Sequence, residues 1–188
     1  MSESGGVSDR AAVAAQLERE PRSVIDVRAR CHLGIPVVIA VPPLLDDGTP
    51  FPTRYWLTCP LASRRIGRIE SRGGVKEAEA KLAADPDLAA RHSAASARYV
   101  AERDALVPPD AAHRPSGGVG GTALGVKCLH AHYADFAAGN DNPVGESAAP
   151  GVEPLDCAVA CVADIDGVVG RNPCLLYTSD AADDYFWV

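Results

Sequence analysis

Cysteine and histidine side chains gather in one short stretch of the chain, between residues 125 and 145. Cys128, His130 and His132 lie there at two-residue intervals, and each offers a metal-binding atom. Thiolate sulfur and imidazole nitrogen are the ligands that a borderline-soft ion such as zinc prefers. This stretch is therefore the first candidate for a site that performs chemistry.

A second pair of thiols lies further along the chain, where three residues separate Cys157 from Cys161. Joined to Cys128 and His132, this pair would complete the tetrahedral Cys3His set of a structural zinc site. The predicted zinc ligands are Cys128, His132, Cys157 and Cys161, with His130, Cys59 and Cys31 as substitutes. The alternative is that the cysteines fill an apolar core without a metal, since free cysteine is among the most buried residue types.

The local pattern predicts a helix over residues 124–138, with an apolar stripe at three- and four-residue spacing. Gly139 suits the C-cap of that helix, and Pro143 prevents its resumption. Cys128 and His132 would then share one helix face, four residues apart. A strand would instead put all three metal-binding side chains on one face, but the alanines and the glycine favour the helix.

Cys59 is the best isolated candidate for a catalytic nucleophile. It precedes Pro60, and proline is favoured in the first turn of a helix. A thiol at a helix N-terminus is expected to have a lowered pKa, because the helix dipole stabilises the thiolate. A partly buried structural cysteine is the alternative interpretation.

A glycine-rich run occupies residues 117–121, just before the cysteine and histidine stretch. Backbone N–H groups that precede a helix can bind phosphate. The run lacks the adjacent lysine and hydroxyl residue of a P-loop. It is more typical of the end of a flexible linker, which we expect over residues 108–121.

Three segments have the composition of β-strands. Polar and apolar residues alternate over residues 25–31, and residues 37–41 form a continuous β-branched run. Residues 53–57 are rich in strand formers, and an Asp-Gly turn at residues 46–48 lies in the connection before them. We expect a small antiparallel hairpin or three-stranded sheet near the N-terminus.

Capping residues and breakers predict helices in the rest of the chain. Ser8 begins a short first helix, and Asp85 with Pro86 begins a long one. The predicted helices cover residues 8–20, 60–72, 75–84, 86–107 and 124–138. Beyond Gly145 the chain reads as a loop. The fold class is therefore α+β, with the N-terminal sheet packed against a helix-rich remainder in one domain over residues 8–165.

The two ends of the chain are set apart from this domain. Residues 1–7 are rich in glycine and serine and are expected to be disordered. Residues 174–184 read as the translation of an adapter used in preparing sequencing libraries. We interpret residues 174–188 as an artefact that stands in place of the natural C-terminus, so that Cys174 is not a native cysteine.

Composition argues against several classes of function. Without the three aspartates of the suspected artefact, 18 basic residues face 22 acidic ones, and the absence of a basic stripe argues against nucleic acid as a partner. No apolar run is long enough for a membrane span and no signal-peptide pattern is present, so we expect a cytoplasmic protein. The five remaining cysteines are odd in number and spread out, which favours reduced thiols or metal ligation over disulfides.

Several longer motifs resemble the bacterial, mainly actinobacterial, domain of unknown function (DUF) 501 family. They are residues 30–36 (RCHLGIP), 47–53 (DGTPFPT), 55–60 (YWLTCP), 126–132 (VKCLHAH) and 142–145 (NPVG), with Arg98-Tyr99 and Glu102-Arg103. The resemblance covers about residues 12–162 and implies no assigned activity. The chain departs from the family pattern at Ser96 and Asp135, where histidines are expected.

Two functional interpretations follow from these residues. The first is a cytoplasmic protein-interaction module, stabilised by a closed zinc site, that binds a protein partner. The second is a metal-assisted hydrolase or transferase acting on a phosphorylated ligand at the glycine-rich run, with three protein ligands and an open position for water. A protein without any metal, in which the cysteines fill the core, is the third interpretation.

Overall fold

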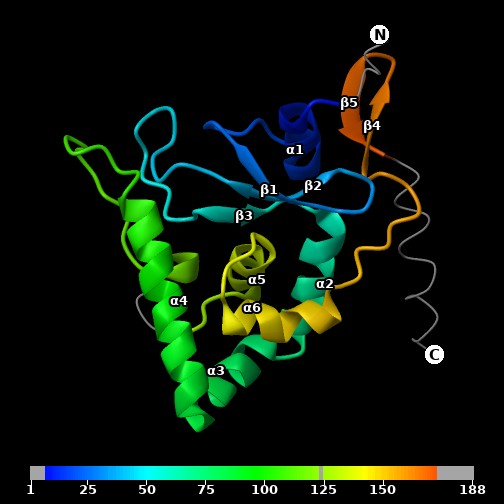
Figure 1. The fold of residues 1–188 in the computed structure, drawn as a ribbon. Helices are drawn as coiled ribbons and strands as arrows, with labels where there is room; N and C mark the ends of the chain where they lie inside the picture. Colours follow the sequence, from blue (N-terminus) through cyan, green and yellow to red (C-terminus); the bar gives the residue numbers. More distant parts are fainter. Residues whose placement is uncertain (1–6, 123–124, 173–188) are drawn as a thin grey trace, which may run out of the picture.

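The computed structural model describes residues 7–122 and 125–172. A three-stranded antiparallel sheet lies between one short helix on one face and a layer of helices on the other (Figure 1). A second, two-stranded hairpin near the C-terminal end of the described residues, drawn in orange, packs beside the short helix (Figure 1). The predicted α+β class is confirmed.

The central strand of the sheet is β2 (Pro36–Ala40), which pairs with β1 (Asp26–Arg30) on one side and with β3 (Tyr55–Leu57) on the other. All five residues of β2 are buried, because side chains cover both faces of the strand. Ile39 packs on one face in a cluster with Val13 of the short helix. The predicted hairpin and third strand are thus confirmed.

The short helix α1 (Asp9–Leu17) begins where the sequence predicts. The hydroxyl of Ser8 accepts a hydrogen bond from the N–H of Ala11 at 3.3 Å, which satisfies one of the unpaired N–H groups at the start of the helix. The buried side chains of this helix include Val13 and Gln16. They attach the helix to one face of the sheet.

The second hairpin was not predicted. It consists of β4 (Val162–Ile165) and β5 (Val168–Arg171), which pair antiparallel and extend past the predicted domain end at residue 165. Asp166 and Gly167, at the turn, both have positive φ, which is the geometry of a two-residue hairpin turn. The Asp-Gly dipeptide between apolar residues was therefore an available signal for this hairpin.

The helical layer lies under the other face of the sheet (Figure 1). It consists of α2 (Pro60–Ser71), α3 (Gly74–Ala84), α4 (Pro86–Asp104), α5 (Leu129–Ala137) and α6 (Pro143–Ala148), with short 3-10 turns at Val119–Gly121 and Ala149–Gly151. Asp85 caps α4 as predicted, since its carboxylate accepts hydrogen bonds from the N–H groups of Asp87 and Leu88 at 3.0 and 3.1 Å. Within the described residues, none of the helices combines the length and apolar character that crossing a bilayer requires.

Helix α5 begins at Leu129 rather than at the predicted residue 124. Cys128 has extended backbone angles, with φ −154° and ψ 146°, and precedes the helix as its N-cap. Glu70 of α2 stabilises this start, because its carboxylate accepts a hydrogen bond from the N–H of Leu129 at 2.5 Å. The predicted pairing of Cys128 with His132 on one helix face is therefore wrong.

Helix α5 ends at Ala137 and does not resume, but Pro143 begins a separate helix, α6, so the chain is not a loop immediately after Gly145 as predicted. Asn142 is the N-cap of α6, and its side-chain oxygen accepts a hydrogen bond from the N–H of Gly145 at 3.0 Å. Helices α5 and α6 approach so closely that a Cβ atom at Gly145 would collide with the carbonyl oxygen of His132 and would lie 2.6 Å from the Cβ of Phe136. The glycine is thus required by packing.

The segment predicted as a flexible linker, residues 108–121, is anchored in its second half. Val119 is buried in the main core, and the buried guanidinium of Arg103 donates to the carbonyl of Gly117 at 2.5 Å. At the N-terminus, Val7 packs beside α1, whereas residues 1–6 of the segment predicted as disordered lie outside the described residues. The interpretation of residues 174–188 as an artefact falls outside them as well.

Replacing Gly145 with alanine should destabilise the protein. The added methyl group overlaps backbone atoms that cannot move independently, and overpacking of this kind costs about 1–3 kcal/mol or more. Gly67→Ala is the matched control, because Gly67 lies inside α2 with open space around it and should gain up to about 1 kcal/mol from helix propensity. Urea unfolding of both variants measures the two changes, and equal stabilities would contradict the close α5–α6 contact.

Candidate functional site

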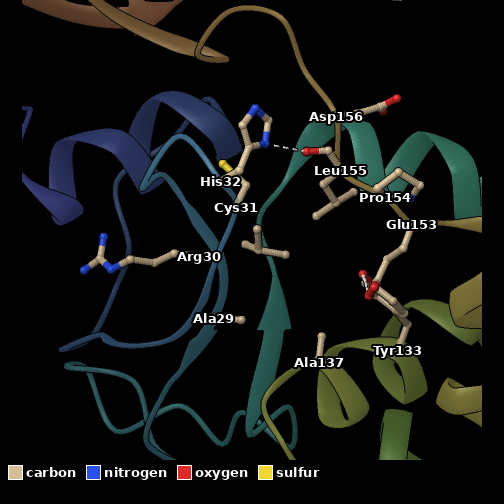
Figure 2. Close-up of a pocket in the computed structure, with 11 residues that line it drawn as sticks. Ala29, Arg30, Cys31, His32, Tyr133, Ala137, Glu153, Pro154, Leu155 and Asp156 are labelled. Atoms are coloured by element: carbon tan, nitrogen blue, oxygen red, sulfur yellow. Dashed lines mark hydrogen bonds between the residues drawn. The ribbon is translucent and has the colours of Figure 1, made fainter.

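A cavity of about 490 Å³ opens between the first hairpin, α5 and the segment before the second hairpin (Figure 2). Its lining comes from three distant parts of the chain: Ala29, Arg30, Cys31, His32, Val37, Tyr133, Ala137 and residues 153–156. This volume, and a largely apolar lining with a few polar groups, are typical of small-molecule sites. We call this cavity the hairpin pocket.

One end of the hairpin pocket is formed by Tyr133 and Glu153, whose side chains meet there (Figure 2). The hydroxyl of Tyr133 donates to the carboxylate of Glu153 at 2.9 Å. Burial raises the pKa of Tyr133, and the neighbouring carboxylate of Glu153 raises it further. The phenol therefore stays protonated as a donor, while the carboxylate keeps further acceptor positions for a ligand.

The other end is formed by His32 and Cys31 (Figure 2). Nδ1 of His32 lies 2.8 Å from the carbonyl oxygen of Leu155, and a carbonyl only accepts, so Nδ1 carries the proton of this hydrogen bond. Arg30 extends away from the cavity (Figure 2). Its guanidinium donates to both carboxylate oxygens of Asp9, each at 2.7 Å.

The wall formed by residues 153–156 is held in place by Arg65 of α2. The guanidinium of Arg65 donates to the carbonyls of Val152 and Pro154 at 2.7 and 2.5 Å. It also forms an ion pair with Asp156 at 2.9 Å. A segment without regular secondary structure is thus fixed against the helical layer, so the hairpin pocket is formed in advance of any ligand.

Four of the cysteines named from the sequence lie in one neighbourhood beside the hairpin pocket. Burial is the main cause that raises the pKa of Cys161, and the nearby thiols of Cys31 and Cys157 raise it further. Cys59 belongs to the same group, since the thiols of Cys161 and Cys157 contribute to its raised pKa. Even so, no group of three or more cysteine, histidine or carboxylate side chains in residues 7–122 and 125–172 is arranged to hold a metal ion.

The two remaining predicted zinc ligands lie elsewhere. Cys128 borders a second cavity of about 460 Å³ together with His130, whose ring also hydrogen-bonds to Glu70 at 3.2 Å. His132 is buried against His92, with 5.3 Å between the two ring centroids. The structure therefore does not bring the predicted Cys3His set together. Cys128 precedes α5 instead of lying within it. Cys157 and Cys161 pack near the first hairpin.

Cys59 lies at the N-terminus of α2, where it is the N-cap residue, but its chemistry differs from the expectation. The residue is 5% exposed, and burial raises the pKa of its thiol to about 11. Loss of hydration of the thiolate thus outweighs the stabilisation that the N-terminus of the helix offers. Cys59 is a core residue, and the prediction of a lowered pKa is wrong.

Two backbone N–H groups of the glycine-rich run already have partners. The N–H of Gly118 donates to the carbonyl of Thr122 at 2.6 Å, and the N–H of Gly121 donates to the carbonyl of Gly118 at 3.0 Å. These donors are used inside the run, and the carboxylate of Glu70 already occupies the N-terminus of α5. The structure gives the interpretation of a phosphorylated ligand at this position no support.

Sequence reasoning missed most of the groups that form the hairpin pocket. Tyr133 falls within the helix predicted over residues 124–138 but was not predicted as a site residue, and neither Glu153 nor Arg65 was singled out. Arg65 and Asp156 lie far apart in the chain, so no spacing rule could pair them. Cys31 was named as a substitute ligand and does border the cavity.

A buried polar network lies around Asp135 of α5. The fully buried carboxylate of Asp135 accepts hydrogen bonds from Arg98 at 2.6 Å, Asn142 at 2.9 Å and Asn140 at 3.0 Å. Burial raises the pKa of Asp135, and these hydrogen bonds oppose that effect. The network fixes the orientation of the Asn142 amide.

The comparisons with known proteins identify a family and no activity. Residues 27–149 match the family described as "Protein of unknown function (DUF501)". No curated protein and no solved structure matches the chain. The site must therefore be interpreted from its own geometry.

Native Cys59 should react very slowly with an alkylating reagent. A pKa of about 11 leaves about one thiol in a thousand ionised at pH 8, and only the thiolate reacts. Mass spectrometry after timed treatment with iodoacetamide should show that Cys59 is modified at least 10-fold more slowly than half-buried Cys31. Both should react alike in denaturant, and fast modification of native Cys59 would show that its thiol is not buried.

The stability of the metal-free protein should fall as the pH is lowered from about 6.5 to 4. Burial lowers the pKa of His132 to about 4 in the folded state, while an unfolded histidine has a pKa near 6.5, so the unfolded state binds more protons in this window. The expected loss is about 3 kcal/mol at pH 4. Urea unfolding across this range should give a flatter profile for His132→Gln, whereas exposed His113→Gln should match the wild type.

Proposed function

The chain belongs to the DUF501 family of proteins of unknown function, and we propose that it binds a small organic amine in the hairpin pocket. The ligand is compact and largely apolar, with one positively charged nitrogen. The observation that carries this proposal is the carboxylate of Glu153, held at one end of a preformed cavity by the hydroxyl of Tyr133.

The apolar part of the ligand is selected by the walls of the cavity. Ala29 lines it from the first hairpin, Ala137 lines it from α5, and Leu155 lines it from the opposite segment (Figure 2). Val37 of the first hairpin also lines it. A volume of about 490 Å³ suits a molecule with an aromatic ring or short aliphatic body. Burial of that body supplies most of the affinity.

The charged groups around the cavity favour a positively charged ligand, because the two neighbouring arginines already bind other groups. Arg30 is turned toward Asp9, and Arg65 is turned toward Asp156 and backbone carbonyls. Neither guanidinium is directed into the cavity, so the carboxylate of Glu153 is available to a ligand there. An ammonium group would donate a charge-assisted hydrogen bond to this carboxylate, which is stronger than one between neutral groups.

We expect phenethylamine to bind the full chain and its acidic counterpart 3-phenylpropionate to bind at least 10-fold more weakly. The two probes share an aromatic body and differ in the sign of their charge. Glu153→Gln should weaken phenethylamine binding by about 10- to 100-fold, which is the effect of losing a hydrogen bond to a charged group. Isothermal titration calorimetry and NMR chemical shifts of residues around the cavity measure both effects.

Glu18→Gln is the matched control, because Glu18 is an exposed carboxylate outside the hairpin pocket and pairs with Arg171. It should bind phenethylamine as the wild type does. Tyr133→Phe, which removes the donor that positions Glu153, should show an intermediate loss. Equal binding of the amine and the acid, or an unchanged affinity in Glu153→Gln, would refute the proposed function.

A further inference from the structure

Two imidazoles lie against each other in the helical layer, away from the hairpin pocket. His92 of α4 and His132 of α5 have ring centroids 5.3 Å apart and an angle of 41° between the ring planes. His132 is 1% exposed. Nδ1 of His92 and Nε2 of His132 are both buried atoms without a hydrogen-bond partner. Unsatisfied buried nitrogens are costly and call for an explanation.

The hydrogen bonds around His132 fix which of its nitrogens carries the proton. The amide of Asn142 donates through Nδ2 to the carboxylate of Asp135 at 2.9 Å. Its oxygen therefore faces the N–H of Gly145 and Nδ1 of His132, at 3.0 and 3.2 Å. An amide oxygen only accepts, so Nδ1 of His132 is protonated, and Nε2 of the neutral ring holds a free electron pair.

His92 is set in the same way from the other side. Burial lowers the pKa of His92, and a hydrogen bond to the backbone of Gly125 opposes that effect, as expected when the ring donates. Nδ1 of His92 is a buried atom without a hydrogen-bond partner, so in the neutral ring protonated at Nε2 it holds a free electron pair. Two neighbouring imidazoles thus each have a buried ring nitrogen without a hydrogen-bond partner.

We propose that His92 and His132 form a binding site for a divalent transition-metal ion such as Zn²⁺ or Co²⁺. Neutral imidazole nitrogen is a preferred ligand of these ions. With a metal–nitrogen distance of about 2.0–2.1 Å and a tetrahedral angle, two coordinating rings would have centroids about 5.2 Å apart, which agrees with the 5.3 Å observed. Water or a small ligand would complete the coordination, because the described residues supply no third protein ligand to such a group.

Two further features suit a metal ion at this place. A histidine that binds a metal typically donates its other N–H to an oxygen that fixes the ring. The side-chain oxygen of Asn142 accepts such a bond from Nδ1 of His132. The second feature is that His92 is only partly buried, so its ring reaches the protein surface. The site differs from the predicted Cys3His set, with which it shares only His132.

The test is a titration of the untagged, metal-free full chain with Zn²⁺, monitored by isothermal titration calorimetry. We expect one ion per chain, and at least a 10-fold loss of affinity in His92→Ala and in His132→Ala. His92→Ala carries the test if the fully buried His132 position does not tolerate alanine, which thermal unfolding would show. His113→Ala is the matched control at an exposed histidine and should bind as the wild type does.

Co²⁺ distinguishes this site from the cysteine neighbourhood. The Co²⁺ complex should lack the thiolate-to-cobalt charge-transfer absorption that cysteine ligands produce, and Cys157→Ser should bind Co²⁺ like the wild type. The proposal is overturned if no ion binds, if His92→Ala keeps the wild-type affinity, or if Cys157→Ser abolishes binding. None of these outcomes bears on the amine site, which shares no residue with the two histidines.

Discussion

The burial of β2 on both of its faces is the constraint on which the rest of the structure depends. Ile39 and Val41 pack in a cluster that includes Val13 of α1, while Val38 and Ala40 pack into the main core with the helical layer. A strand with apolar side chains on both faces must be covered on each side, because exposure of those side chains to water is unfavourable. Helix α1 supplies one cover and the helical layer the other, so the sheet lies between two apolar clusters.

The hairpin pocket depends on polar contacts that hold one of its walls at one end of the sheet. The segment 153–156 has no ladder of its own, and Arg65 supplies donors to its carbonyls from α2. These hydrogen bonds attach the segment to α2. The path of this segment brings Glu153 to Tyr133 and carries Cys157 and Cys161 toward Cys31, away from Cys128.

Desolvation decides the protonation state of the groups that the sequence suggested for chemistry. It raises the pKa of the Cys59 thiol to about 11 and lowers the pKa of the His132 imidazole to about 4, so both side chains are neutral near pH 7. For Cys59 neutrality removes a nucleophile. For His132 neutrality preserves an electron pair, and the Asn142 amide, oriented by Asp135, selects the nitrogen that holds it.

The sequence by itself determined the elements whose signals are local. Ser8 and Asp85 cap their helices through their own side chains, and the β-branched run of β2 defines a buried strand, so the α+β class followed without tertiary information. Family membership likewise followed from motifs along the chain. Only the tertiary structure decided the start of α5, which depends on Glu70 from another helix, and the partners of each candidate ligand. Contacts between residues far apart in sequence set these features, and no local spacing rule encodes such contacts.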